Sequence, residues 1–128
     1  MVHALSETKN IDRNSDLYGK AFEHFIAMEI RAFLSYTKSD EKLMFWRSKH
    51  GHEVDCLVGE RLAIEVKATR KIRESDLSGL RALAEEKICR QYIVVSHDPH
   101  ETKDRDIHAM PWNVFLKRLW ESDLINTH

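Results

Sequence analysis

Three charged residues interrupt a stretch that is otherwise typical of buried strands. In EVDCLVGERLAIEVKA, residues 53–68, apolar residues dominate both sides of Gly59, yet Asp55, Glu65 and Lys67 stand among them. Burying a charged group costs free energy unless a counter-charge or a cation compensates it. The stretch therefore predicts two strands joined by a turn, with a charged site built on them.

Side-chain alternation decides between two registers for this hairpin, because a shift of one residue moves every side chain to the opposite face. A two-residue turn mixes polar and apolar side chains on both faces. A three-residue turn at residues 59–61 leaves one face apolar and places Asp55 opposite Glu65 on the other. Glu53 then lies opposite Lys67 and is expected to pair with it. The apolar pairs of this favoured register are Val58 with Leu62, Cys56 with Ile64, and Val54 with Val66.

Two facing carboxylates repel each other, and a divalent cation relieves the repulsion. Mg²⁺ and Mn²⁺ prefer a few carboxylate oxygens plus water, which leaves positions open for phosphate oxygens. Asp55 and Glu65 meet this demand, and the main-chain carbonyl of Val66 adds a third protein ligand. Lys67 is suited to orient or deprotonate water and to offset charge on a phosphorane-like transition state. The pattern predicts metal-assisted phosphodiester hydrolysis; the alternative is a cross-strand ion pair on a solvated face.

The spacing of apolar residues in the rest of the chain predicts the elements that position this site. Residues 1–15 lack a periodic pattern and are expected to form a loose arm before a single domain at 16–128. The fold class is α/β, a central mixed sheet of four or five strands flanked by helices, with a loop at 97–106. The expected elements are a helix over 16–36, strands at 43–47, 53–58 and 62–68, a helix over about 77–88, strands at 91–96 and 107–110, and a helix that opens at Pro111.

Composition limits the possible functions. A chain of 128 residues suits one compact domain, and its net charge of −1 provides no global attraction to nucleic acid or to an anionic membrane. Cys56 and Cys89 are far apart and form no C-x-x-C motif, so neither a disulfide framework nor a zinc ribbon is expected. No apolar run is long enough to cross a bilayer and the first residues lack a signal pattern, so we expect a cytoplasmic protein without a membrane partner.

The order Asp55, nine residues, then Glu65-Val66-Lys67 resembles the signature of the PD-(D/E)XK nuclease superfamily. The resemblance implies a restriction-endonuclease-like core, a Mg²⁺ or Mn²⁺ cofactor and hydrolysis of DNA. In that superfamily a glutamate on the first helix often joins the metal site. Helical geometry leaves Glu23 and Glu29 equivalent, and the resemblance favours Glu23. Val54 stands where the superfamily name has proline.

A closer similarity covers nearly everything after about Tyr18. The segments GKAFEHFIAMEI, LMFWRSKHGHEVDCLV, LAIEVKA, LSGLRAL and MPWNVFLKRLW are together similar to the nuclease-like C-terminal domain, of unknown function, of prokaryotic AAA-type ATPases. This similarity implies an AAA-type ATPase as a partner. The ATPase motif G-x-x-x-x-G-K-[ST] is absent from the sequence, so we expect a detached domain, a truncated gene product or a stand-alone relative.

Two basic groups flank the predicted site. Arg70, Lys71 and Arg73 follow the third strand, and Arg47 and Lys49 close the first. They are predicted to contact DNA phosphates, with ordinary solvated loops as the alternative.

His50 and His52 precede Asp55 and suggest zinc, but no third soft ligand is suitably spaced, so magnesium is favoured.

The aromatic residues are expected in the core or at a docking face, and Trp120 is the candidate for an interface. An exposed sheet edge is also expected to allow pairing with a second copy as a homodimer. The alternative to a nuclease is a catalytically inactive module for interaction, regulation or dimerisation. The aromatic set is Phe45, Trp46, Trp112 and Trp120.

Overall fold

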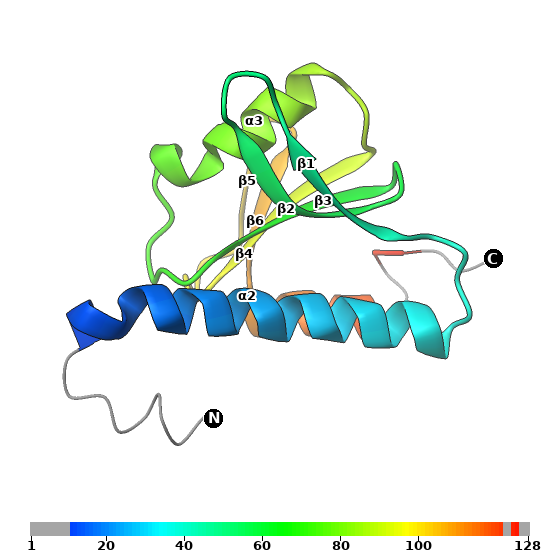
Figure 1. Cartoon of the computed structure of the whole chain (residues 1–128), viewed down its shortest axis with the longest axis horizontal. Coiled ribbons are helices and arrows are strands. Elements are labelled where there is room, and N and C mark those ends of the chain that lie inside the picture. The colour runs from blue at the N-terminus through cyan, green and yellow to red at the C-terminus, as the bar shows by residue number, and fades with distance from the viewer. Residues whose placement is uncertain (1–10, 122–123, 126–128) are drawn as a thin grey trace.

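A computed structural model describes residues 11–121 and 124–125 (Figure 1). Residues 1–10 of the arm predicted at 1–15 lie outside this range, whereas residues 11–15 are helical. Helix α2 begins at Ile11, earlier than the predicted Asp16. The elements are α2 (Ile11–Tyr36), β1 (Leu43–Arg47), β2 (Glu53–Val58), β3 (Leu62–Lys67), the 3₁₀ turn η1 (Glu74–Leu77), α3 (Ser78–Glu85), β4 (Gln91–Ser96), β5 (Thr102–Asp104), β6 (Ile107–Pro111) and α4 (Trp112–Trp120).

The strands form one mixed sheet in the order β1-β2-β3-β4-β6-β5. The pairs β1–β2, β2–β3 and β5–β6 are antiparallel, whereas β3–β4 and β4–β6 are parallel. The predicted α/β class with a mixed sheet is confirmed, but the sheet has six strands rather than four or five. The additional strand, β5, lies inside the predicted loop at 97–106, and all its side chains are exposed.

Helices cover both faces of the sheet, and each face has its own core. α2 and α4 pack on one face through a cluster that includes Ile26, Ile64 and Phe115. α3 packs on the other face through a cluster that includes Leu80, Ala63 and Val94. In Figure 1, α2 runs along one side of the molecule with α3 on the opposite side. The central strands β3 and β4 are almost continuously apolar because both of their faces are buried.

Close packing of α3 against the sheet depends on a glycine. Gly79 is buried in the first turn of α3, and a methyl group at this position would overlap the carbonyl oxygen of Glu53 on β2. Any larger residue must therefore move α3 away from the strand that carries Asp55. No helix within the described residues has the length and hydropathy needed to cross a membrane.

Candidate functional site

The hairpin of β2 and β3 has the predicted register near its turn. Gly59 adopts a positive φ of 55° in the turn, and Cys56 pairs with Ile64 as expected. The ladder ends there, and the predicted pairing of Val54 with Val66 is wrong. Val54 instead packs in the cluster beneath α3, whereas Cys56 and Val66 lie in the cluster beneath α2.

An irregularity in β2 explains this difference. Between the pairs Met44–Leu57 and Trp46–Val54, β2 uses one more residue than β1. Such a bulge bends a strand and reverses the face on which its next side chains lie. It occurs at the segment that contains Asp55, and β2 diverges from β3 beyond this point (Figure 1).

Beyond the pair Cys56–Ile64, β2 and β3 form no main-chain ladder, and this leaves an opening between them. The side chains of Asp55 and Glu65 bond across this opening. The Val66 N–H donates a hydrogen bond to Asp55 Oδ2 at 3.1 Å, and the Asp55 N–H donates to Glu65 Oε1 at 3.4 Å. Each carboxylate therefore binds the main chain of the opposite strand. The structure brings the two predicted acids to one point between the strands.

Lys67 lies at the same point, but its partner differs from the predicted one. Its Nζ is 3.1 Å from Glu65 Oε2. Glu53 instead accepts a hydrogen bond from Arg47 on β1 at 2.7 Å. The reason is that Glu53 remains paired with β1 after β2 has diverged from β3.

Burial makes the site electrostatically unfavourable for its acids. The Glu65 residue is only 7% exposed, and burial, reinforced by the charge of Asp55, raises its pKa to about 7. Burial also raises the pKa of Asp55, although the Val66 N–H and Lys67 oppose this change. Burial works to lower the pKa of Lys67, but the two carboxylates more than offset it and the pKa rises. The single ammonium does not fully compensate two carboxylates.

Glu23 on α2 is exposed, and its charge interacts with those of Asp55 and Lys67. Partial burial raises its pKa, the charge of Asp55 raises it further, and Lys67 lowers it. Glu29, which helical geometry alone could not distinguish from Glu23, instead accepts a hydrogen bond from Trp120 Nε1 at 3.0 Å. Of the two glutamates, Glu23 is therefore the one that senses the charges of the site.

The donor set suits a hard divalent cation. One buried and one half-buried carboxylate, Glu65 and Asp55, together with the main-chain carbonyl of Val66, match the oxygen ligands that Mg²⁺ and Mn²⁺ prefer, with water completing the shell. In the described part of the chain, no three His, Cys, Asp or Glu side chains come together as a metal site. His50 and His52 lie at the β1–β2 turn, where the main-chain N–H of each bonds Ser48 Oγ.

Comparison with known families gives one match. Residues 18–115, well over half of the chain, match the model of a "Domain of unknown function (DUF4143)". The chain belongs to this family. Neither the curated proteins nor the solved structures contain a significant match. The match includes all four acidic and basic residues of the site: Glu23, Asp55, Glu65 and Lys67.

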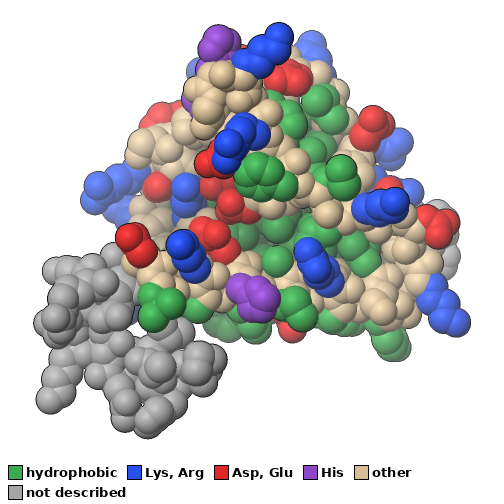
Figure 2. All heavy atoms as spheres, viewed as in Figure 1, with side chains coloured by type: hydrophobic (Ala, Val, Ile, Leu, Met, Phe, Trp, Pro, Cys, Tyr) green, Lys and Arg blue, Asp and Glu red, His purple; other side chains and the backbone are tan. Residues whose placement is uncertain are grey.

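The predicted phosphate-binding residues of this DUF4143 domain lie in two separate places. Arg70, Lys71 and Arg73 are exposed on the loop that leaves β3 directly after Lys67. Arg47 ends β1 and Lys49 lies in the β1–β2 turn, which projects away from α2 in Figure 1. Figure 2 shows acidic and basic side chains gathered above one half of α2.

Two residues of the DUF4143 domain beside this site were not predicted from the sequence. The Tyr18 hydroxyl and His97 Nε2 are 2.7 Å apart, and the His97 ring stacks on Phe22 with 4.4 Å between centroids. His97 directly follows Ser96, which is the β4 partner of Lys67. Burial lowers its pKa, as does Arg70. Its position after a parallel strand, at the edge where ligands of α/β sheets commonly bind, was the available signal.

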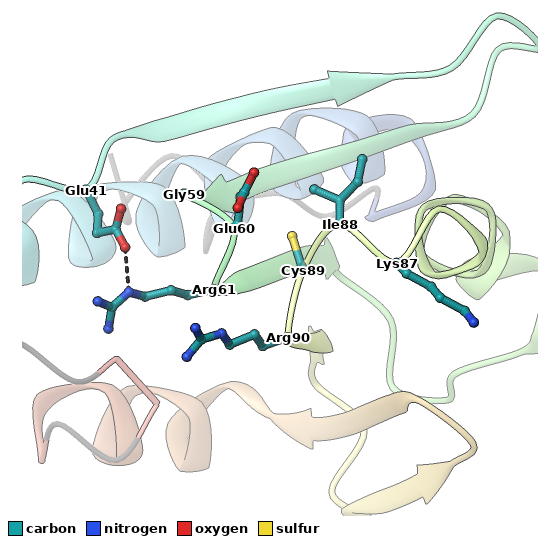
Figure 3. A pocket seen from close by; sticks show the side chains of 8 residues that line it. All are labelled: Glu41, Gly59, Glu60, Arg61, Lys87, Ile88, Cys89 and Arg90. Atoms are coloured by element: carbon teal, nitrogen blue, oxygen red, sulfur yellow. Dashed lines mark ion pairs between the residues drawn. The ribbon is translucent and has the colours of Figure 1, made fainter.

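The DUF4143 domain also has a hollow of about 460 Å³ at the opposite end of β3 (Figure 3). Its lining includes Glu41, Arg61 and Arg90, and Glu41 and Arg61 form an ion pair of 2.5 Å across it. Leu62 at this end pairs with Gln91, whereas Lys67 pairs with Ser96 at the other. The hollow is therefore separate from the carboxylates.

Proposed function

We propose that this domain is a Mg²⁺- or Mn²⁺-dependent nuclease that hydrolyses phosphodiester bonds in DNA. The observation that carries the proposal is the opening between β2 and β3, where Asp55 and Glu65 meet beside Lys67. The order of these residues also supports it, through their resemblance to the PD-(D/E)XK superfamily, and the α/β sheet is compatible with such a core.

Each residue has a distinct task in this proposal. Asp55, Glu65 and the carbonyl of Val66 would hold the metal, with Glu23 contributing from α2. The bound metal would supply positive charge that polarises a phosphate and lowers the pKa of water. Lys67, which is partly exposed and whose raised pKa favours the charged form, would orient the attacking water and donate hydrogen bonds to a phosphate oxygen.

The loop after β3 supplies the DNA contacts in the proposal. Arg70 and Lys71 are exposed and lie within a few residues of Lys67, so they can contact phosphates that flank the cleaved bond. The guanidinium of Arg47 already binds Glu53, and its contact with DNA stays a prediction. Association with an AAA-type ATPase belongs to the proposal on the strength of the family resemblance. A cytoplasmic location is carried over from the expectation based on the sequence.

A second candidate is a catalytically inactive module that serves interaction or regulation. One observation favours it: the Lys67 ammonium already lies 3.1 Å from Glu65 and offsets part of the buried charge without a metal. In that reading the charged cluster holds the two diverging strands together.

Cleavage of plasmid and single-stranded DNA in the presence of Mn²⁺ distinguishes the two candidates. The nuclease proposal expects cleavage by the natural chain, none in EDTA, and a loss of at least about 100-fold in Lys67→Ala, as for removal of a catalytic group. Lys87→Ala is the matched control, because Lys87 is exposed at the other end of the sheet. Cleavage that persists in Lys67→Ala, or no cleavage by any protein, contradicts the proposal.

A further inference from the structure

Helix α2 carries a second apolar face that does not contact the sheet. Four large residues on it are exposed: Leu17 at 56%, Phe25 at 42%, Met28 at 49% and Tyr36 at 79%. A fifth, Tyr18 at 38%, lies at its edge, and its hydroxyl is bonded to His97. Together with Ala21 and Ala32 they fall within a sector of about 100° on a helix of 3.6 residues per turn. The buried side chains of α2 that pack on the sheet occupy a different sector. An exposed apolar stripe that runs the length of a helix marks an interaction surface.

The order of residues along this stripe is symmetric. Residues pair about the point midway between Ile26 and Ala27: Phe25 with Met28, Ala21 with Ala32, and Leu17 with Tyr36. Each of these three pairs joins large to large or small to small, whereas Tyr18 at the edge of the stripe corresponds to Ser35 and lies outside this pattern. A two-fold interface requires one surface to be complementary to itself, and an antiparallel helix pair creates these contacts. The two alanine positions permit the backbones to approach closely.

The surroundings of the stripe are compatible with this arrangement. On one side the rings of α4 extend it, since Trp112 contacts Phe25 at 6.0 Å and Trp120 contacts Tyr36 at 5.9 Å between centroids. On the other side, α2 exposes Lys20 and Arg31. Figure 2 shows basic side chains along α2 with hydrophobic ones at the margin below them. The two-fold operation places the Lys20 and Arg31 flank of one copy beside the same flank of the other copy. These like charges repel each other, so added salt should strengthen association.

We propose that two copies of this chain associate through the α2 stripe as an antiparallel, two-fold symmetric helix pair. The occupant is a second copy because the symmetric order of large and small residues matches the stripe to itself. This inference does not rest on the proposed nuclease activity, and the interface residues Phe25 and Met28 differ from the residues of the charged site. It also differs from pairing at the exposed edge of β1.

Analytical ultracentrifugation tests the association with two matched variants. Met28 and Met44 are comparably exposed, at 49% and 54%, but Met44 lies on β1. We expect a dimer for the natural chain and for Met44→Glu, and a monomer for Met28→Glu with an unchanged circular dichroism spectrum. A monomeric natural chain, or a dimer that Met28→Glu does not disrupt, overturns the proposal. Loss of the dimer in Met44→Glu alone would instead identify the β1 edge.

Cysteine cross-linking tests the antiparallel register. The natural Cys56 and Cys89 are buried, so an introduced surface thiol can be followed separately. A mixture of Ala21→Cys and Ala32→Cys proteins should form a mixed disulfide on oxidation. Ala21→Cys alone should not, because its two copies would be about 16 Å apart along the helix axis. Efficient cross-linking of Ala21→Cys to itself contradicts the register. DNA cleavage measured on the same Met28→Glu monomer keeps this outcome separate from that of the proposed function.

Discussion

Replacing Glu65 with glutamine is expected to stabilise the fold at alkaline pH and to have little effect at acid pH. Glu65 has a pKa of about 7 in the folded protein, raised by burial and Asp55 from an ordinary value of 4.5. As pH rises from 4.5 to 7, the unfolded chain loses this proton while the folded chain retains it. The free energy of unfolding therefore falls across this interval. Below the interval Glu65 does not change it, and above the interval it is lower by the full cost of burying the ionised carboxylate.

The loss of unfolding free energy caused by ionised Glu65 follows from its pKa values in the unfolded and folded chain. A change from 4.5 to about 7 corresponds to about 3 kcal/mol of unfolding free energy above pH 7. Glutamine has a similar shape and can still accept the Asp55 N–H, but it carries no charge to desolvate. The variant should therefore gain about 3 kcal/mol relative to the natural chain between pH 4 and pH 8.

Urea unfolding at pH 4, 6 and 8 in EDTA, followed by tryptophan fluorescence, measures this difference. The control is Glu53→Gln, which removes an exposed carboxylate from the neighbouring strand, where an ion pair contributes about 0–1 kcal/mol. A stability difference between Glu65→Gln and the natural chain that stays constant from pH 4 to pH 8 would contradict a raised pKa of Glu65. It would mean that Glu65 is solvated or fully compensated by Lys67.

Two further predictions concern the fold and the DNA contacts. Gly79→Ala should lower the unfolding free energy by about 1–3 kcal/mol, because the added methyl group overlaps the Glu53 carbonyl. Gly19→Ala, in an open part of α2, should instead raise it by up to about 1 kcal/mol, and urea unfolding of both variants checks the pair. Arg70→Ala should weaken DNA binding in fluorescence anisotropy and reduce its salt dependence, whereas Arg47→Ala should change it less, because Arg47 already binds Glu53. Equal effects of the two arginine variants would contradict the placement of the DNA beside β3.

Local side-chain patterns were sufficient to predict most of the helices and strands. Alternation fixed the pairing of Cys56 with Ile64, because only one register keeps an apolar face intact. The bulge in β2 was not predictable in this way, since alternation assumes an uninterrupted ladder and carries no signal for an extra residue in one strand. β5 was missed because an exposed, polar edge strand has no hydrophobic pattern to recognise.

Part of the candidate site was likewise predictable from the sequence, and part of it was not. Asp55, Glu65 and Lys67 were predictable as one group because they belong to a single hairpin. The choice of Arg47 rather than Lys67 as the partner of Glu53 was not, because it follows from the bulge. His97 escaped notice because its neighbours in space come from distant segments, and only the sheet order places it beside Lys67.

Calorimetric titration with Mn²⁺ at pH 8 tests the proposed metal site without requiring activity, because metal binding precedes any catalysis. We expect one Mn²⁺ per chain in the natural protein, with binding lost in Asp55→Asn and Glu65→Gln and retained in Glu53→Gln. The same variants should lose Mn²⁺-induced stabilisation against urea. Undetectable binding to the natural chain, or equal binding by Glu65→Gln, would contradict a metal site between β2 and β3.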